Sequence, residues 1–219
     1  MERKQGSLTE QVKTETLDVV YQDHLGGCAL GGDGATYYPQ MWSYMVKEYH
    51  IKSVIDIGCG KAFSADYFKH LGATVRGVEG CREAVEKSFL EPEEIVLHDY
   101  ENDGPYIPKE VFDLAWSCEF VEHVEESHMK NFFETFKRCR FLALTFAIPG
   151  QGGHHHVNEQ FGEYWISHLA KEGFVLEEEK THQLREIAKR DREKYSPFYE
   201  SHFIQRGLLF TNLNTLYAL

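Results

Sequence analysis

Short apolar runs alternate with segments of helical apolar spacing along most of the chain. The runs are SVIDIG (53–58), TVRGVEG (74–80), EIVLHD (94–99), FDLAWS (112–117) and FLALTFA (141–147). Between them, apolar residues recur every three or four positions, which is typical of a helix with one buried face. Apolar strands that alternate with such helices indicate a parallel sheet covered on both sides. We therefore predict a doubly wound α/β fold.

The same patterns predict the elements around these strands. Residues 1–20 form a polar, weakly amphipathic arm, and the glycine-rich stretch 24–36 predicts a loop. Helices are expected over 37–50, 63–71, 81–89, 118–139, 163–172 and 183–194, and two further strands over 174–180 and 203–212. We expect an arm and loop over 1–36 and one domain over 37–219, with a histidine-rich loop at 150–163 and a helical insertion at about 183–200.

Composition narrows the class of protein. A chain of 219 residues that is 42% hydrophobic and 26% charged is long enough for one buried core and is ordinary for a soluble protein. No apolar stretch reaches about 18 residues, so we expect no membrane span. The opening segment MERKQGSLTEQVKTE lacks the apolar core of a signal peptide. We therefore expect a cytoplasmic protein.

Cysteine spacing and charge argue against further classes. The five cysteines are scattered and form no C-x-x-C pair, which argues against a disulfide framework and a structural zinc site. A formal net charge of -12 does not supply the basic surface that grips nucleic acid. We expect neither nucleic acid nor a membrane as a partner, and the sequence does not fix the oligomeric state.

The turn after the first of these strands is the place to look for a ligand, because open α/β sheets bind ligands beyond the carboxyl ends of their strands. Asp56 lies at the end of this strand, and Gly58 and Gly60 allow a sharp turn and the close approach of a ligand. A buried Asp56 needs a partner, either backbone N–H groups of the loop or a cationic ligand. Phe63 stands where a dinucleotide-binding turn has its third glycine, which disfavours a nicotinamide or flavin cofactor.

Polar residues close the next strands at the same edge of the sheet. The second strand ends in Glu79, an acid placed to accept both hydroxyls of a ribose. The third ends in Asp99, which is followed by Tyr100, a side chain suited to bonding and stacking an adenine. The fourth ends in Ser117, Cys118 and Glu119. Successive strands that all end in this way indicate a ligand site.

These residues resemble the motifs of class I S-adenosylmethionine-dependent methyltransferases over roughly 37–212. The resemblance rests on D-x-G-x-G at 56–60, on the acids of VRGVEG and VLHDY, and on FDLAWSCEFVEHVEE (112–126). The last segment is similar to the F-D…E-H segment of small-molecule methyltransferases. The resemblance implies a Rossmann-like sheet of seven strands, the last antiparallel, and S-adenosyl-L-methionine as the cofactor. One departure is Ala62, where the family often has another glycine.

The resemblance also implies a role for each motif. The glycine loop would hold the methionine part of the cofactor, the second-strand acid the ribose and the third-strand acid the adenine amine. The residues after the fourth strand would line the methyl-transfer site. The cofactor-binding residues carried over in this way are Asp56, Gly58, Cys59, Gly60, Glu79, Gly80, Asp99, Tyr100, Ser117, Cys118 and Glu119.

The histidine-rich segment GGHHHVNEQFGEYW (152–165) follows the fifth strand, again at the ligand edge. Three interpretations stay open: a general base, a divalent-metal site helped by Glu119 or Glu159, or polar loop residues that orient Asn158. Adjacent histidines of an extended loop point in alternate directions, which weakens the metal interpretation. We therefore expect no metal, and activity that persists in a chelator.

Two histidines are candidates for a catalytic base. His156 is the first choice because it lies closest to the start of the following helix, and His123 is its rival because a helix N-terminus keeps an imidazole neutral. The histidines expected to be structural or on the surface are His24, His50, His70, His168 and His202.

The sequence therefore predicts an S-adenosylmethionine-dependent methyltransferase with a small-molecule acceptor. O-methylation of a sugar or another hydroxyl compound is favoured, because candidate bases crowd the expected site. Two alternatives stay open, namely a nicotinamide-dependent oxidoreductase and a non-catalytic protein that binds the cofactor or a partner chain.

Overall fold

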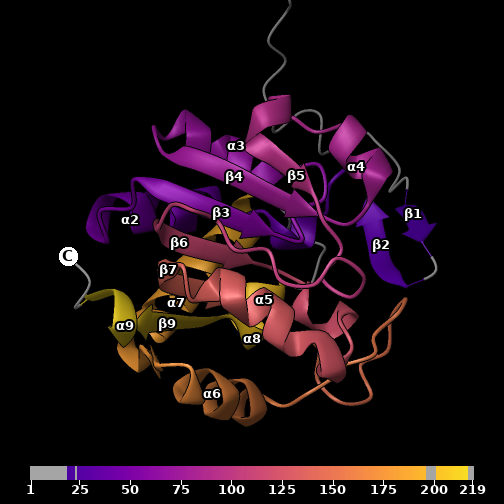
Figure 1. The fold of residues 1–219 in the computed structure, drawn as a ribbon. Helices are drawn as coiled ribbons and strands as arrows, with labels where there is room; N and C mark the ends of the chain where they lie inside the picture. Colours follow the sequence, from indigo (N-terminus) through magenta and orange to yellow (C-terminus); the bar gives the residue numbers. More distant parts are fainter. Residues whose placement is uncertain (1–18, 23, 196–200, 217–219) are drawn as a thin grey trace, which may run out of the picture.

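A seven-stranded sheet forms the centre of the molecule, and a two-stranded hairpin lies beside it (Figure 1). The computed structural model describes residues 19–22, 24–195 and 201–216. The sheet contains β3 (Ser53–Ile57), β4 (Thr74–Glu79), β5 (Ile95–Leu97), β6 (Phe112–Ser117), β7 (Cys139–Leu144), β8 (Phe174–Leu176) and β9 (Leu208–Asn212). The hairpin is made of β1 (Val19–Gln22) and β2 (Leu25–Ala29).

Helices connect the strands and cover both faces of the sheet (Figure 1). They are α2 (Pro39–Glu48), α3 (Phe63–His70), α4 (Arg82–Glu86), α5 (Met129–Phe136), α6 (Gly162–Lys171), α7 (Glu178–Tyr195), α8 (His202–Arg206) and α9 (Leu213–Leu216). Short 3-10 turns precede α2 and α5. Within the described ranges, no helix has both the length and the apolar character that a membrane crossing requires.

The strand order is β5-β4-β3-β6-β7-β9-β8. Pairing is parallel from β5 through β7, whereas β9 runs antiparallel to both β7 and β8. Because β4 and β6 pair with opposite edges of β3, the order of the strands reverses there, and a crevice opens at their carboxyl ends. The predicted doubly wound sheet of seven strands, with the last one antiparallel, is confirmed.

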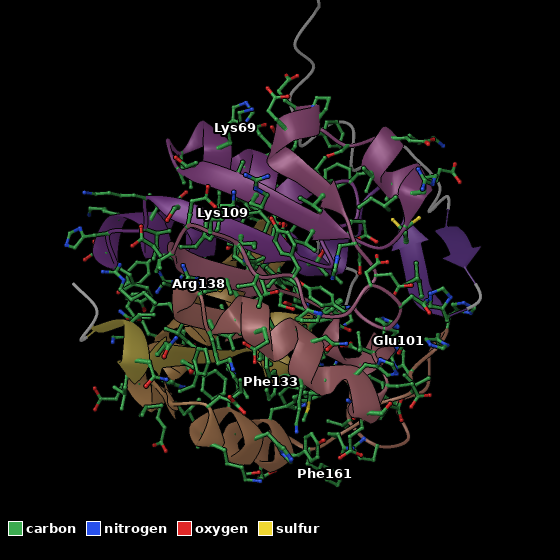
Figure 2. All side chains as sticks on the ribbon, viewed as in Figure 1. Lys69, Glu101, Lys109, Phe133, Arg138 and Phe161 are labelled. Atoms are coloured by element: carbon green, nitrogen blue, oxygen red, sulfur yellow. The ribbon has the colours of Figure 1, made fainter. Side chains whose placement is uncertain are left out.

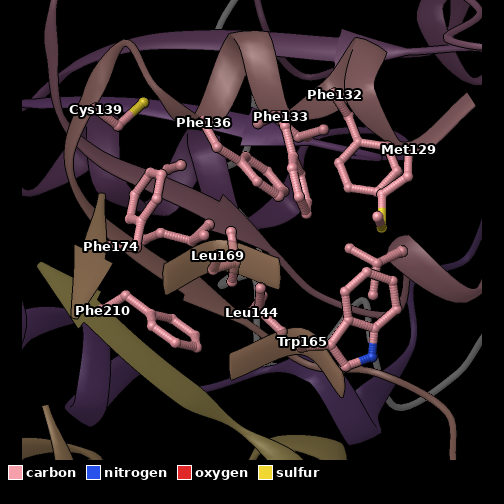
Figure 3. Packing of buried hydrophobic residues seen from close by; sticks show 14 of the residues in the cluster. Met129, Phe132, Phe133, Phe136, Cys139, Leu144, Trp165, Leu169, Phe174 and Phe210 are labelled. Atoms are coloured by element: carbon pink, nitrogen blue, oxygen red, sulfur yellow. The ribbon is translucent and has the colours of Figure 1, made fainter. Parts of the chain in front are cut away.

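Successive side chains of the central strands pack into two separate cores, one on each face of the sheet. Ile55 of β3 faces the core under α5 and α6, whereas its neighbour Val54 faces the core under α2, α3 and α7. Figure 3 shows the first core, where Phe132 and Phe136 of α5 face Trp165 and Leu169 of α6. Burial of this apolar surface on both faces fixes the register of the strands, because a slip of one residue would exchange the two cores.

The second core joins elements that are far apart in the sequence. Tyr38, at the start of α2, is 1% exposed, and its hydroxyl accepts a hydrogen bond from the backbone N–H of Phe203 at 3.0 Å. The Phe203 ring stacks on Trp116 of β6 with centroids 5.6 Å apart. The start of α8 is therefore fixed against the middle of the sheet. Outside these cores, side chains such as Lys69, Lys109 and Phe161 lie at the surface (Figure 2).

The structure corrects several expected boundaries. The stretch 24–36 is not only a loop, because it contains β2 and a 3-10 turn at Gly34–Thr36. The expected strand over 203–212 begins only at Leu208, since its first half forms α8. The strand at 174–180 ends at Leu176, and the charged helix begins five residues early, at Glu178. The helix expected from 118 begins at Met129, after two 3-10 turns. Residues 1–18 and 196–200 lie outside the described residues.

Candidate active site

A pocket of about 230 Å³ opens at the carboxyl ends of β3, β4 and β6. The hairpin closes one side of it, since Leu25 contacts Gly80 and the Gly26 backbone lies against the His123 ring. The sequence-predicted residues that line this pocket are Asp56, Gly58, Cys59, Gly60, Glu79, Gly80, Asp99, Tyr100, Cys118, Glu119 and His123. Ser117 and His156 are not among the lining residues.

The glycine turn after β3 is held in a conformation that few residues adopt. Gly58 and Gly60 have φ of 69° and 54°. A Cβ on Gly58 would lie 2.6 Å from the Phe120 ring, so this position excludes a side chain as well as requiring positive φ. Ala62, the departure from the family pattern, also has positive φ, at 66°. The loop therefore keeps the geometry that a glycine would favour, at a small cost in strain.

Asp56 finds its partners within the protein. Its carboxylate accepts hydrogen bonds from the hydroxyl of Ser64 and from the backbone N–H of Ala65, at 3.2 Å in the second case. Both donors belong to the first turn of α3, where backbone N–H groups lack partners in the helix. Burial raises the pKa of Asp56 to about 7, although these hydrogen bonds oppose the shift. Asp56 thus ties the glycine turn to α3.

Glu79 bridges two loops of the pocket. One carboxylate oxygen accepts from the backbone N–H of Gly60 and the other from that of Cys81, both at 2.7 Å. Burial raises the pKa of Glu79 above its ordinary value, while the backbone donors lower it. Each oxygen keeps a further lone pair, so the carboxylate can hold the turn and accept from a ligand.

Asp99 belongs to a polar cluster that the sequence did not reveal. Its carboxylate contacts the His24 ring and accepts from the side-chain amide of Asn102 at 2.7 Å. Burial raises the pKa of Asp99, but the hydrogen bonds from His24 and Asn102 outweigh it, and the pKa lies below its ordinary value. The expectation that His24 is only structural or on the surface is therefore incomplete: it joins the hairpin to the end of β5.

Tyr100 lines the pocket as a nearly buried part of its wall. Its ring is 3% exposed and packs edge-on against Phe120, and its hydroxyl pairs with Thr135 at 2.9 Å. A polar contact between this hydroxyl and an adenine is therefore not set up in this arrangement. Ser117 is completely buried in the same region and does not face the pocket.

Glu119 stands at the end of β6 in a strained backbone conformation, with φ of 53°. Its carboxylate accepts from the hydroxyl of Thr145 at 2.7 Å and from the His202 ring at 2.9 Å. His202 also approaches Asp33, at 3.7 Å. Burial lowers the pKa of His202, but the two carboxylates outweigh it and raise the pKa to about 9. His202, which we expected to be structural or on the surface, is therefore a cation held between two acids at the pocket.

The two candidate bases lie side by side at the far wall of the pocket. The rings of His123 and His156 have centroids 4.9 Å apart. Burial, together with the neighbouring His156, lowers the pKa of His123 to about 4, so this ring is neutral at physiological pH. His156 bonds through Nδ1 to Glu159 at 3.1 Å. Which of them acts as a base stays a prediction.

Sequence reasoning missed Asp33, Thr145 and His202 because each lies far along the chain from the residue that it contacts. Glu122 stood inside the E-H segment but had no assigned role. In the structure it is completely buried, and burial and the nearby Glu119 carboxylate raise its pKa well above its ordinary value. A buried acid next to a histidine was the signal that the sequence offered for it.

Comparison with known families adds to this geometry. Residues 55–140 match the model of a family described as a methyltransferase domain. Over these residues the chain is similar to a methyltransferase domain. The matched residues run from β3 to the start of β7 and include the glycine turn, Glu79 and Asp99. This match is in keeping with the predicted cofactor, S-adenosyl-L-methionine, and not with a nicotinamide cofactor.

Solved structures resemble this chain at low sequence identity. The plantazolicin methyltransferase BpumL, bound to a triazolic desmethylPZN analog and S-adenosylhomocysteine, is 11% identical, covers 78% of this chain and 79% of its own, and has a TM-score of 0.52. The same enzyme with a monoazolic analog is 12% identical, with a TM-score of 0.48, and the match spans only 63% of either chain. The methyltransferase domain of bacterial CtHen1-C is 20% identical, with coverages of 63% and 86% and a TM-score of 0.47. No curated protein matches the chain.

Proposed function

We propose that the protein transfers a methyl group from S-adenosylmethionine to a hydroxyl of a small molecule in the cytoplasm. The observation that carries this proposal is the continuity of the pocket. One wall holds Glu79 and the glycine turn, and the other holds Glu119 and His123. A single space thus joins a nucleoside-binding side to a side that carries titratable groups. All five cysteines are free thiols, in keeping with a reducing compartment.

The donors and acceptors of the pocket support an assignment of the cofactor side. We assign the methionine part to the turn at Gly58 and Gly60, the ribose hydroxyls to the free lone pairs of Glu79, and the adenine amine to Asp99. His24 and Asn102 keep Asp99 ionised, which strengthens its capacity to accept a hydrogen bond from an amine. The methyl group then faces the end of β6.

The chemistry needs alignment and removal of one proton. The acceptor oxygen forms a bond to the methyl carbon while the carbon–sulfur bond breaks, and its electron pair stays on sulfur to give S-adenosylhomocysteine. The hydroxyl proton leaves as the new bond forms, so a group near the acceptor has to favour the alkoxide. We assign this assistance to His123 and His156, the histidines at the acceptor wall, of which His123 faces the pocket.

The charge of the molecule argues against one class of acceptor. The chain carries a formal net charge of -12, which disfavours a polyanionic acceptor. Hydroxyl compounds are preferred to amines because the acceptor wall offers neutral imidazole next to carboxylates.

The test is formation of S-adenosylhomocysteine from S-adenosylmethionine in the presence of matched small molecules. Each pair carries the same skeleton with either a hydroxyl or an amine. We expect turnover with members of the hydroxyl set, and methylated oxygen in the product by mass spectrometry. Turnover with amines alone would contradict the oxygen preference, and no turnover with any acceptor, despite tight cofactor binding, would favour the non-catalytic alternative.

A further inference from the structure

Glu122 is a buried acid without a hydrogen-bond partner. Its side chain is 0% exposed, and neither carboxylate oxygen has a partner. With the Glu119 carboxylate close by, a carboxyl in such a place costs several kcal/mol, whether it is kept as an unpaired charge or as an unsatisfied polar group. Proteins rarely keep such a group without a ligand or a charge to compensate it. The position therefore calls for a partner that the polypeptide does not supply.

Two histidines supply nitrogen donors at the same point. One carboxylate oxygen of Glu122 and one nitrogen each from His123 and His156 all lie within 4.8 Å of one another. His123 follows Glu122 in the 3-10 turn after β6, and His156 comes from the histidine-rich loop. The backbone N–H groups of Val157 and Asn158 both donate to the carbonyl of Glu122 at 3.0 Å, so the loop is fastened to the turn that carries the acid.

The hydrogen bonds of the His123 and His156 rings use Nδ1 in both cases, and they leave Nε2 of each ring for a ligand. Nδ1 of His156 lies 3.1 Å from the Glu159 carboxylate, and Nδ1 of His123 lies 3.3 Å from the carbonyl oxygen of His155. A ring that donates from Nδ1 presents the lone pair of Nε2. Histidines that bind metals are typically oriented in this way, by a carboxylate or a backbone carbonyl on the far nitrogen.

Glu159, which orients the His156 ring, is itself held by the backbone of the histidine-rich loop. Besides its contact with His156, its carboxylate accepts from the backbone N–H groups of Gly150 and Gly152 at 2.7 and 2.6 Å. On the other side, His123 is pressed against the Gly26 backbone, where a Cβ would come within 2.6 Å of its ring. Both rings are thus held in place before any ligand arrives.

We propose that Glu122, His123 and His156 together bind one divalent first-row transition cation. One carboxylate and two imidazoles suit such ions better than Mg²⁺ or Ca²⁺, which prefer oxygen ligands. Three protein ligands also leave coordination positions open for an outside oxygen. His155, next to the site, has positive φ of 53°, one of the strained positions that are common around functional sites.

The cation gives the acceptor wall a specific role, and this part of the inference rests on the proposed function. Because His123 lines the pocket, an ion on this ring would lie at its wall, where it can bind the acceptor hydroxyl. A bound cation lowers the pKa of such a hydroxyl, so the proton passes to water and the oxygen attacks the methyl carbon. The histidines would then assist deprotonation as ligands, and the expected persistence of activity in a chelator would be reversed.

The first experiment measures binding of the ion alone, without cofactor or acceptor. Chelator-treated protein is titrated with Mn²⁺ by electron paramagnetic resonance and with Co²⁺ by calorimetry and visible absorption. We expect one equivalent per chain. Glu122→Gln, His123→Ala and His156→Ala should each weaken binding by about 100-fold or more, since even loss of a supporting contact costs about 10- to 100-fold. His154→Ala, in the same loop but outside the cluster, is the matched control and should bind as the wild type does.

Thermal unfolding separates loss of the site from loss of the fold. The ion should raise the melting temperature of the wild type and of His154→Ala but not that of Glu122→Gln. Without the ion, Glu122→Gln should be at least as stable as the wild type, because it removes a buried carboxyl. Equal binding by the wild type and Glu122→Gln, or weakening by His154→Ala to the same degree as by the cluster variants, would overturn the site.

Failure of this inference is distinguishable from failure of the proposed function. Methyl transfer that continues in chelator, with no ion bound by the wild type, removes the metal site and leaves the methyltransferase assignment intact. One bound equivalent that is lost in the cluster variants, without transfer to any hydroxyl acceptor, supports the site and removes the O-methylation proposal. The full proposal requires that chelator abolish transfer and that Mn²⁺ or Co²⁺ restore it, while binding of S-adenosylhomocysteine stays unchanged.

Discussion

At the scale of single residues, several side chains of the pocket hold the protein together and face the ligand at the same time. Glu79 is the clearest case, because its two oxygens accept from Gly60 and Cys81 and still have lone pairs to offer. That carboxylate holds Gly60, one of the two positive-φ glycines of the turn. A substitution at Glu79 therefore acts on the ligand directly and on the shape of the turn.

Glu79→Ala should weaken binding of S-adenosylhomocysteine by roughly ten- to a hundred-fold, the effect of removing a charged hydrogen-bond acceptor. Calorimetry on the purified variant measures the affinity, and circular dichroism checks that the fold is kept. Glu83→Ala is the matched control, because this acid on α4 pairs with Lys87 at the surface. Unchanged affinity in Glu79→Ala would mean that the cofactor does not lie against β4.

His202 gives a pH-dependent prediction. Its pKa is raised from 6.5 to about 9, so the protonated ring stabilises the folded state. That contribution is complete below about pH 6.5 and disappears as the pH rises through about 9. His202→Gln should lower the free energy of unfolding by on the order of 2–3 kcal/mol at pH 6 and by little at pH 10.

Urea unfolding of wild type and His202→Gln across this pH range provides the measurement. The same substitution at His168, whose ring contacts Tyr164 on α6, is the control and should not reproduce the pH window. A stability difference that is equal at both ends of the range would show that the ion pair of His202 with Glu119 does not form.

At the scale of elements, the apolar pattern predicts the strands of the sheet well, but it predicts the hairpin and α8 poorly. Strands such as FDLAWS are continuous apolar runs, so burial on both faces identifies them. The hairpin strand LGGCA contains two glycines and no continuous apolar run, and it pairs with β1 beside the pocket. Likewise α8 is short, and its anchor is the packing of Phe203 on Trp116, a contact between residues far apart in the chain.

A buried acid ties the charged helix α7 to α2. Asp191 is completely buried, and its two oxygens accept from the backbone N–H groups of Gln40 and Met41, both at 2.9 Å, in the first turn of α2. Asp191, which belongs to α7, therefore caps the N-terminus of α2. The expected helical insertion is thus an integral part of the second core.

Asp191→Ala should destabilise the protein by about 1–3 kcal/mol, because it leaves two backbone donors in the first turn of α2 without acceptors. Denaturant unfolding measures the change, and Glu193→Ala, an exposed acid on the same helix, should have little effect. Cofactor affinity should stay the same in both variants, since neither residue lines the pocket. Equal stability of Asp191→Ala and Glu193→Ala would show that Asp191 does not stabilise the N-terminus of α2.

At the scale of the whole molecule, the site is assembled from distant segments. The motif residues Asp56, Glu79 and Asp99 were predictable, because parallel strands bring their carboxyl ends to one edge. Their partners were not: His24 reaches Asp99, and His202 reaches Glu119, only through the folded hairpin and α8. Spacing along the chain carries no signal for such contacts, whereas the pairing of buried acid and histidine at 122–123 was visible but unassigned.

Binding of S-adenosylhomocysteine tests directly whether the pocket is the site of an S-adenosylmethionine cofactor. Calorimetric titration of the protein should show one equivalent bound, with NADH giving no heat under the same conditions. We expect the nucleoside to lie against Glu79 and Asp99, and we expect no dinucleotide site at the turn that carries Phe63. Binding of NADH together with absence of binding of S-adenosylhomocysteine would contradict it.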